Sequence, residues 1–210
     1  MLKLYYAPGT CALACWIALE WAGLEHEVEK VDPHAESYLK INPLGLVPAL
    51  DIGAQRPYTQ ADAILQYVAH LAPAAKLGAV SDKEGVLEFT ETMSFLTGDF
   101  HPAFWPYFAP QRFTTETSSS GISAVKESAY ARVARVLEHL NNLIETSGGL
   151  HVYRGRRSVA DAYAYIMTRW STPMPGTASW KNYKTLSQFM DTMSKDSSVH
   201  KVLKASNNNQ

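Results

Sequence analysis

Residues 2–32 have the sequence LKLYYAPGTCALACWIALEWAGLEHEVEKVD, and this stretch decides the fold. Residues 2–6 are mostly apolar and aromatic and precede a proline–glycine pair, as in a short buried strand followed by a turn. Over residues 11–22 the apolar side chains recur at helical spacing, and a glycine follows. Residues 26–32 alternate charged side chains with valines. A strand, a helix and a strand within about 30 residues predict a parallel, right-handed α/β unit.

The next stretch extends this α/β unit. Residues 33–43 are irregular, and residues 45–50 then have the pattern of a third strand, interrupted by Pro48. Because proline cannot donate a hydrogen bond to a strand ladder, we expect Pro48 at the beginning or edge of that strand. Residues 56–58 supply a short fourth strand, and a helix with one apolar face follows over 59–71.

Beyond this unit the sequence predicts only helices. Residues 72–80 are rich in alanine, contain a proline and a glycine, and are interpreted as a linker. The expected helices cover 82–109, 122–146, 158–171, 181–193 and 196–204. Ser158 and Asp161 have the spacing of a capping box. The polar stretch 114–123 and the tail 206–210 are expected to be mobile. We therefore predict two domains, 1–75 and 82–205.

Composition and charge exclude several classes of function. The chain has 210 residues, 46% of them hydrophobic, which is enough for a sizeable core. Its 19 basic and 20 acidic side chains leave a net charge of -1, so the positive field that holds a nucleic acid is missing. The sequence has neither a signal-peptide pattern nor a run of about 18 apolar residues. We expect a cytoplasmic protein without nucleic-acid or membrane partners.

The two cysteines, Cys11 and Cys15, lie one helical turn apart in the first predicted helix. A disulfide between them would not link separate parts of the chain, so a reducing compartment fits best. Cys11 lies at the first turn, where the helix dipole and unpaired N–H groups favour the thiolate. We expect Cys11 to be reactive, or else a small buried apolar side chain, and Cys15 to be buried and slow. No further ligand cluster accompanies the pair, so we predict no metal site.

Four short motifs lie far apart in the sequence. They are 4–11 (LYYAPGTC), 41–50 (INPLGLVPAL), 63–67 (AILQY) and 158–163 (SVADAY). In this order they resemble the motifs of the glutathione transferases, more narrowly of the bacterial beta class, and the resemblance covers nearly the whole chain. It implies an α/β thioredoxin-like N-terminal domain and an all-α C-terminal domain, the glutathione transferase fold. It also implies glutathione as co-substrate, a homodimer and a function in detoxification.

The resemblance assigns glutathione contacts in the first domain. Cys11 matches a cysteine that lies beside the glutathione sulfur and can form a mixed disulfide with it. Val47 precedes Pro48, and a cis peptide bond there would turn the Val47 backbone toward the cysteinyl part of the tripeptide. Tyr6 and Thr10 are expected to be further contacts. Tyr6 packed in the core and a trans peptide before Pro48 are the alternatives.

The remaining contact in this domain is the turn at Thr59, Gln60 and Ala61, where a helix begins and its free N–H groups favour an anion. The family usually has an acidic residue followed by Ser or Thr here, which bind the γ-glutamyl end. Gln60 and Ala61 replace them, so the ligand loses an ionic partner and a hydroxyl donor. Asp62 lies about 100° further round the helix and does not obviously substitute. We expect weaker or altered binding.

In the second domain the resemblance points to His101, which matches a histidine that faces the glutathione sulfur. His101 lies in the aromatic stretch 100–108, within a long helix that Pro102 and Pro106 should kink. The aromatic side chains either line an apolar pocket for a second substrate or belong to the core. The family often has lysine after the histidine, and Pro102 removes that contact.

We therefore predict a homodimeric glutathione transferase that conjugates glutathione to small apolar electrophiles and exchanges disulfides through Cys11. One alternative is a binding or regulatory protein with this fold and weak or no catalysis, which Gln60, Ala61 and Pro102 suggest. Another is an enzyme specialised for a glutathione conjugate or another thiol. The dimer is expected to be C2-symmetric and held by apolar contacts of the helix at about 82–100, through Phe89 and Met93.

Overall fold

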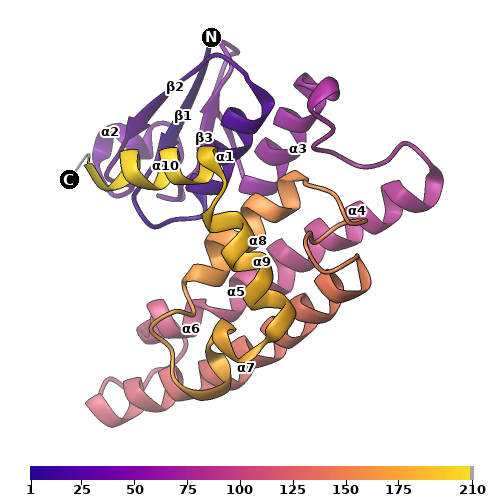
Figure 1. Cartoon of the computed structure of the whole chain (residues 1–210). Helices are drawn as coiled ribbons and strands as arrows, with labels where there is room; N and C mark the ends of the chain where they lie inside the picture. The colour runs from indigo at the N-terminus through magenta and orange to yellow at the C-terminus, as the bar shows by residue number, and fades with distance from the viewer. Residues whose placement is uncertain (209–210) are drawn as a thin grey trace.

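The N-terminal domain is built on a mixed four-stranded sheet (Figure 1). The computed structural model describes residues 1–208. The strands are β1 (Leu2–Tyr6), β2 (His26–Lys30), β3 (Ala49–Asp51) and β4 (Tyr58–Thr59), in the spatial order β2-β1-β3-β4. Strand β1 is parallel to β2, which confirms the predicted unit, and β3 is antiparallel to β1 and to β4.

Three helices belong to this domain: α1 (Ala12–Ala22), α2 (Glu36–Leu39) and α3 (Ala61–Leu71). Helix α1 ends at Gly23, whose φ of 64° lies in the left-handed region that glycine adopts without strain. Helix α2 lies inside the stretch that we expected to be irregular, and there the expectation was wrong. Its four residues are too few to show a helical period in the sequence.

The second domain is helical, which confirms the predicted fold class of a thioredoxin-like domain followed by helices. Its α-helices are α4 (Lys83–Phe95), α5 (His101–Ala103), α6 (Trp105–Phe108), α7 (Ser119–Thr146), α8 (Val159–Arg169), α9 (Lys184–Ser194) and α10 (Ser197–Asn208). A π-helical turn covers Leu96–Phe100, and 3-10 turns cover Pro73–Ala75, Pro110–Arg112, Gly176–Ala178 and Trp180–Asn182. Within residues 1–208 there is no helix with the length and apolar character needed to cross a bilayer.

The single helix expected over 82–109 is divided into shorter pieces. The π-helical turn follows α4, and Pro102 and Pro106 each occupy the first turn of a short helix, where a missing N–H costs nothing. The predicted loop 114–123 is wrong from Ser119 onward. Ser118 caps α7 by accepting a 3.1 Å hydrogen bond from the Gly121 backbone N–H, so the polar stretch begins the helix.

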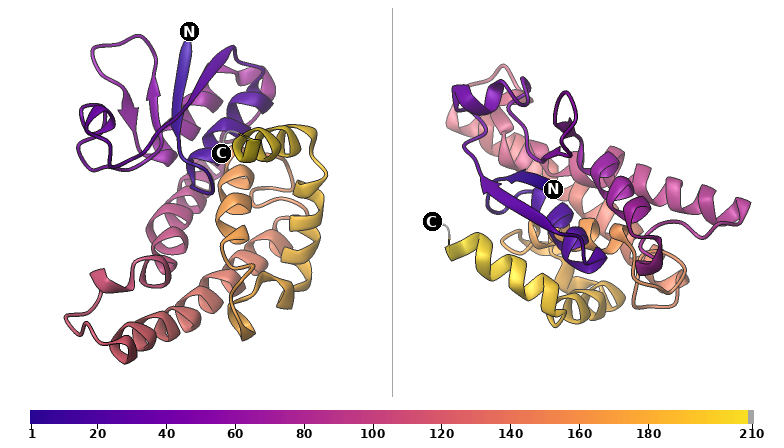
Figure 2. Two further views of the ribbon diagram at one scale, coloured as in Figure 1. Left: turned by 90° about the vertical axis from the view of Figure 1, so that its left-hand side faces the viewer. Right: turned by 90° about the horizontal axis from the view of Figure 1, so that it is seen from above.

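The C-terminal helix returns to the first domain. Helix α10 lies against α1, as Figures 1 and 2 show, so the predicted mobile tail is helical over 206–208 and otherwise lies outside the described residues. Trp21 Nε1 donates a 3.0 Å hydrogen bond to Asp196. Lys201 Nζ lies 2.8 Å from the Glu20 carboxylate.

The linker between the domains is held in place by the segment before α8. The Arg156 guanidinium donates to the carbonyl oxygens of Lys76 and Gly78. The Tyr153 hydroxyl accepts a 3.0 Å hydrogen bond from the Val80 N–H and donates a 2.8 Å bond to the Gly85 carbonyl. The orientation of the two domains therefore rests on side chains as well as on the peptide chain.

Candidate functional site

Cys11 lies at the start of α1, directly after the turn that leaves β1. Its Sγ is 3.6 Å from the carbonyl oxygen of Val47. The side chain is only 7% exposed, as in the alternative expectation of a small buried side chain. Burial raises the pKa of the Cys11 thiol to about 12, and a backbone hydrogen bond at the helix start opposes this only partly. Cys11 is therefore a protonated thiol at neutral pH.

The peptide bond Val47-Pro48 is cis and lies directly before β3. The carbonyl oxygen of Leu46, one residue earlier, accepts hydrogen bonds from the Tyr38 hydroxyl at 2.8 Å and from the Asn42 amide at 2.6 Å. Both donors come from the segment around α2. Their bonds fix the loop that brings Val47 to the Cys11 thiol.

The turn that begins α3 approaches α1 at Cys15, one helical turn beyond Cys11. Cys15 is fully buried, as expected, and its Sγ is 3.7 Å from the carbonyl oxygen of Ala61. Gln60 has a φ of 75°, a region that side-chain-bearing residues rarely adopt, and no side chain caps the first turn of α3 within the described residues. Asp62 accepts a 2.8 Å hydrogen bond from Gln66, so its carboxylate is engaged along the helix surface. The first turn of α3 retains N–H groups that can bind an anion.

The two other predicted contacts have structural roles in this chain. Tyr6 is fully buried, and its ring centroid lies 5.0 Å from that of Trp16, so in this structure it offers no surface to a ligand. The Thr10 hydroxyl donates a 2.7 Å hydrogen bond to the Ala7 carbonyl and closes the turn before Cys11. Thr10 therefore shapes the backbone on which the thiol is mounted.

His101 lies in α5, among aromatic side chains. Its Nδ1 is 2.8 Å from the hydroxyl oxygen of Tyr163, and its ring centroid is 5.0 Å from that of Trp170. Burial lowers the pKa of His101 to about 4, so its imidazole is neutral at neutral pH. A neutral imidazole carries one donor nitrogen and one acceptor nitrogen.

Trp170 connects this aromatic group to the loop that carries Cys11. Its Nε1 donates a 2.8 Å hydrogen bond to the carbonyl oxygen of Gly9, and its ring lies 5.6 Å from that of Phe108. Phe108 and Trp105 are about half exposed. The result is an apolar wall beside the turn of Cys11. The sequence pattern predicted aromatic residues here from the stretch 100–108, but Trp170 lies outside that stretch and was missed.

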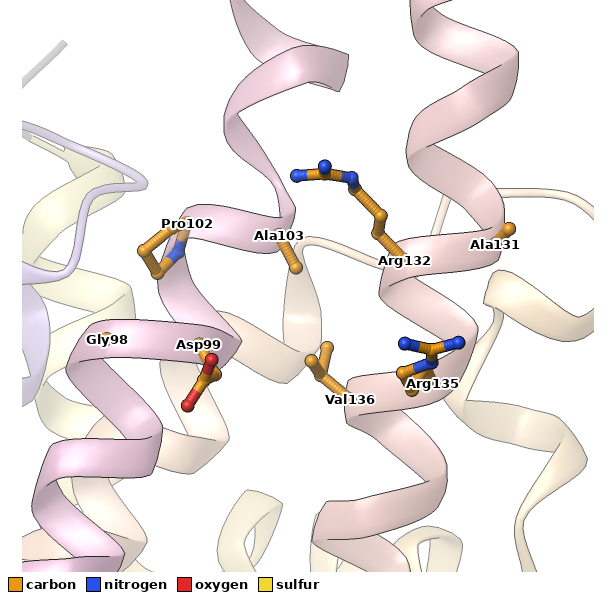
Figure 3. A pocket seen from close by; sticks show the side chains of 8 residues that line it. All are labelled: Gly98, Asp99, Pro102, Ala103, Ala131, Arg132, Arg135 and Val136. Atoms are coloured by element: carbon orange, nitrogen blue, oxygen red, sulfur yellow. The ribbon is translucent and has the colours of Figure 1, made fainter.

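A separate cavity lies between the segment around Pro102 and helix α7. Its volume is about 370 Å³, and its lining includes Asp99, Arg132 and Arg135. Figure 3 shows Arg132 reaching from α7 toward the segment that carries Pro102 and Ala103. None of the predicted site residues lines this cavity.

Asp161 supports the fold, as expected. It is fully buried, and its carboxylate accepts 2.7 Å hydrogen bonds from the backbone N–H groups of Ser158 and Val152. The predicted capping box is therefore present at the start of α8. Among residues 1–208 no group of three or more His, Cys, Asp or Glu side chains is arranged to hold a metal ion.

Known proteins are similar to this chain over most of its length. Residues 9–71 match the family model described as glutathione S-transferase, N-terminal domain. Glutathione S-transferase GST-4.5 from Xanthomonas campestris pv. campestris is 32% identical over 211 residues, covering 97% of this chain and 98% of that protein.

The chain belongs to the glutathione S-transferase family.

Two solved structures of glutathione S-transferases have the same fold. One is the sphingomonad enzyme complexed with glutathione, which is 31% identical with a TM-score of 0.82, covering 98% of both chains. The other is the bacterial beta-class enzyme from Sphingomonas chungbukensis, also 31% identical, with a TM-score of 0.80, covering 97% of this chain and 98% of that chain. The family resemblance inferred from the motifs is thereby confirmed.

In this glutathione S-transferase, separate motifs meet around the first turns of α1. Val47 approaches Cys11, Ala61 approaches Cys15, and Trp170 reaches the loop before Cys11. The arrangement offers a backbone edge, an uncapped helix start and an apolar wall. These features suit a polar peptide ligand next to an apolar one.

Proposed function

We propose that this chain is a glutathione transferase, which binds glutathione in its N-terminal domain and joins the glutathione sulfur to small apolar electrophiles. The main support is that Cys11, Val47 and the uncapped start of α3 come together around α1, although they lie far apart in the sequence. In this proposal the backbone of Val47 pairs with the cysteinyl part of glutathione. The γ-glutamyl carboxylate binds at Gln60 and Ala61.

The chemistry of the proposal is stabilisation of the glutathione thiolate. Lowering a thiol pKa by two units corresponds to about 2.7 kcal/mol of interaction. Cys11 keeps its own proton because burial raises its pKa to about 12, so the attacking sulfur is that of glutathione. His101 is neutral and supplies a hydrogen-bond donor. The electrophile binds against Trp105, Phe108 and Trp170.

Thiol–disulfide exchange is a slower second reaction in this proposal. The Cys11 thiolate attacks one sulfur of glutathione disulfide, which forms a mixed disulfide and releases one glutathione thiolate. Only the thiolate reacts, and a pKa of about 12 leaves little thiolate at neutral pH. The exchange rate is therefore expected to rise with pH.

We also propose a cytoplasmic C2 homodimer with a glutathione-binding domain over 1–75 and a helical domain over 82–205. The residues expected at the interface must be corrected, because Phe89 and Met93 are 4% and 1% exposed and belong to the core. Val86 and Leu87, on the same helix, are exposed. They are the apolar residues of α4 that a partner can cover.

A binding protein without turnover is the second candidate. It is favoured by Gln60 and Ala61, which lack the acidic and hydroxyl side chains usual in the family, and by Pro102 after His101. Calorimetry with glutathione and turnover with an aryl halide, measured on one preparation, distinguish the two. Binding with turnover supports the enzyme, and binding without turnover supports the second candidate. A folded protein that does not bind glutathione contradicts both.

A further inference from the structure

We propose that Tyr163 is a positioning residue, which holds His101 in the tautomer with its proton on Nε2. This inference rests on the proposed function, because the protonated Nε2 would be the donor offered to the glutathione sulfur. It adds a residue from helix α8 to the site.

The Tyr163 hydroxyl is held firmly. Tyr163 lies in the first half of α8, a helix that begins at the capping box of Ser158 and Asp161 and packs against α1. Its side chain is 2% exposed, and its hydroxyl oxygen is 2.8 Å from His101 Nδ1. Burial raises the pKa of this hydroxyl, and a negative charge on Cys11 or Cys15 would raise it further, which places the hydroxyl close to the thiols.

The direction of the hydrogen bond follows from what else the hydroxyl can reach. Nδ1 is the only hydrogen-bond partner of the Tyr163 hydroxyl within residues 1–208. If Nδ1 were the donor, the hydroxyl proton would be left in a buried site without an acceptor, which is costly. The hydroxyl must therefore donate to Nδ1. Nδ1 is then an unprotonated acceptor, and the ring proton is on Nε2.

The other ring nitrogen is available to a ligand. His101 Nε2 makes no hydrogen bond within the described part of the chain. It is not one of the buried polar atoms without a partner, so it is exposed to open space. Burial lowers the pKa of His101 and raises that of Tyr163, so both groups are neutral over the working range of pH. In this state the pair presents a single outward donor, Nε2–H.

The tautomer matters because the two nitrogens have opposite effects on a thiolate. An Nε2–H group donates to the sulfur and stabilises its charge, whereas an Nε2 lone pair repels it. Without the tyrosine hydroxyl, a neutral imidazole distributes its proton between both nitrogens. Tyr163 thus determines what fraction of the molecules has a competent His101.

The tautomer can be measured directly by nitrogen NMR of protein labelled with ¹⁵N-histidine. The chain has seven histidines, and the His101→Gln variant identifies the signals of His101. We expect an unprotonated Nδ1 and a protonated Nε2 in the wild-type protein at neutral pH, without any ligand. In Tyr163→Phe we expect a mixture of both tautomers. A protonated Nδ1 in the wild type, or an unchanged tautomer in Tyr163→Phe, overturns the proposal.

Kinetics test the consequence for the reaction. Tyr163→Phe should lower kcat about three- to tenfold, with a glutathione dissociation constant changed less than about twofold. His101→Gln places an amide N–H₂ near Nε2 and should retain more activity than His101→Asn, whose amide lies near Nδ1. Adding Tyr163→Phe to His101→Gln should lower kcat no further. A further loss of the same size would mean that Tyr163 acts independently of His101.

Tyr165→Phe is the matched control. Tyr165 lies on the same helix and is 4% exposed, and its hydroxyl has no hydrogen-bond partner among the described residues. Its loss should leave both the His101 tautomer and kcat unchanged. Failure of the proposed function is recognised separately: the protein would show the predicted tautomer but neither bind nor turn over glutathione. The tautomer result decides the inference about Tyr163 in either case.

Discussion

Trp170 and Gly9 are 161 positions apart, and the indole Nε1 of the first donates a 2.8 Å hydrogen bond to the carbonyl oxygen of the second. Gly9 belongs to the turn between β1 and α1, and Trp170 follows α8. The bond thus ties the helical domain to the turn that carries Cys11. The same indole ring contacts His101, so one side chain relates the two predicted catalytic residues.

We predict that Trp170→Phe affects kcat more strongly than it affects the free energy of unfolding. The phenyl ring keeps the apolar contact but removes the donor to Gly9, which costs about 1 kcal/mol of folding free energy. The turn before Cys11 should then become more mobile, and kcat should fall severalfold. Trp180→Phe is the control, because Trp180 Nε1 donates to Thr172, within the helical domain. Equal losses of kcat in both variants would contradict the prediction.

The stability of the protein should depend on pH through His101. Its pKa is about 4 in the folded state and about 6.5 in the unfolded chain, so the unfolded state binds more protons between these values. This contribution is complete above pH 6.5 and is lost as the pH falls toward 4, by about 2 kcal/mol for a partly exposed ring. Denaturant unfolding at several pH values should show a shallower loss in His101→Gln than in the wild type. Parallel curves would refute the assignment.

Alkylation of both thiols should be slow at neutral pH. Burial raises the pKa of Cys11 to about 12 and raises that of the fully buried Cys15 as well. Cys11 is the more accessible and should be labelled first, with a rate that rises steadily from pH 7 to pH 9. Peptide mass mapping after timed labelling measures this. Fast labelling of Cys11 that does not change over this range would show a thiolate.

Ala61→Ser should strengthen glutathione binding. A serine hydroxyl at the uncapped start of α3 supplies a donor to the γ-glutamyl carboxylate, and a charge-assisted bond of this kind is worth about 1.5 to 3 kcal/mol. We expect at least a severalfold fall in the dissociation constant measured by calorimetry. Ala63→Ser, at an exposed position on the same helix, is the control. Unchanged or weaker binding in Ala61→Ser would mean that another group occupies this turn.

Leu87→Glu should dissociate the proposed dimer. Leu87 is 70% exposed on α4, and a charge buried at an apolar interface is strongly unfavourable. The wild-type dimer should persist in about 1 M salt, because its contacts are apolar and salt screens only charges. Light scattering at micromolar concentration measures the mass. Leu150→Glu, at another exposed leucine outside α4, is the control and should remain dimeric. Dissociation of the wild type by salt would instead point to an interface of ion pairs.

The sequence predicted the regular elements well because their patterns are local. The strand–helix–strand unit and α8 each carry their own periodicity, turn residues or caps, as Gly23 and the capping box of Ser158 show. Helix α2 was missed because four residues have no detectable period. The division of the 82–109 helix was underestimated, since prolines were expected to bend the helix rather than to begin new ones.

The site was harder to predict than the fold, because its properties depend on contacts between distant residues. The dipole argument correctly put Cys11 at a helix start, but the pKa of its thiol depends on how much protein covers it. Val47 and the helical domain cover the Cys11 thiol, and the sequence pattern around Cys11 describes neither of them. Likewise, His101 and Tyr163 are 62 positions apart, and the sequence around neither residue has a pattern that predicts their pairing.

Helix α1 is buried around its whole circumference over Ala12 to Leu19, because β1 and α3 of its own domain and α8 and α10 of the second domain all pack against it. A fragment ending at residue 80 would therefore expose a continuous apolar surface and should aggregate when expressed alone. By architecture the chain has two domains, but thermodynamically it should behave as one cooperative unit with a single melting transition. If the first half of the chain were duplicated or exchanged between proteins, a compatible C-terminal helix would have to accompany it.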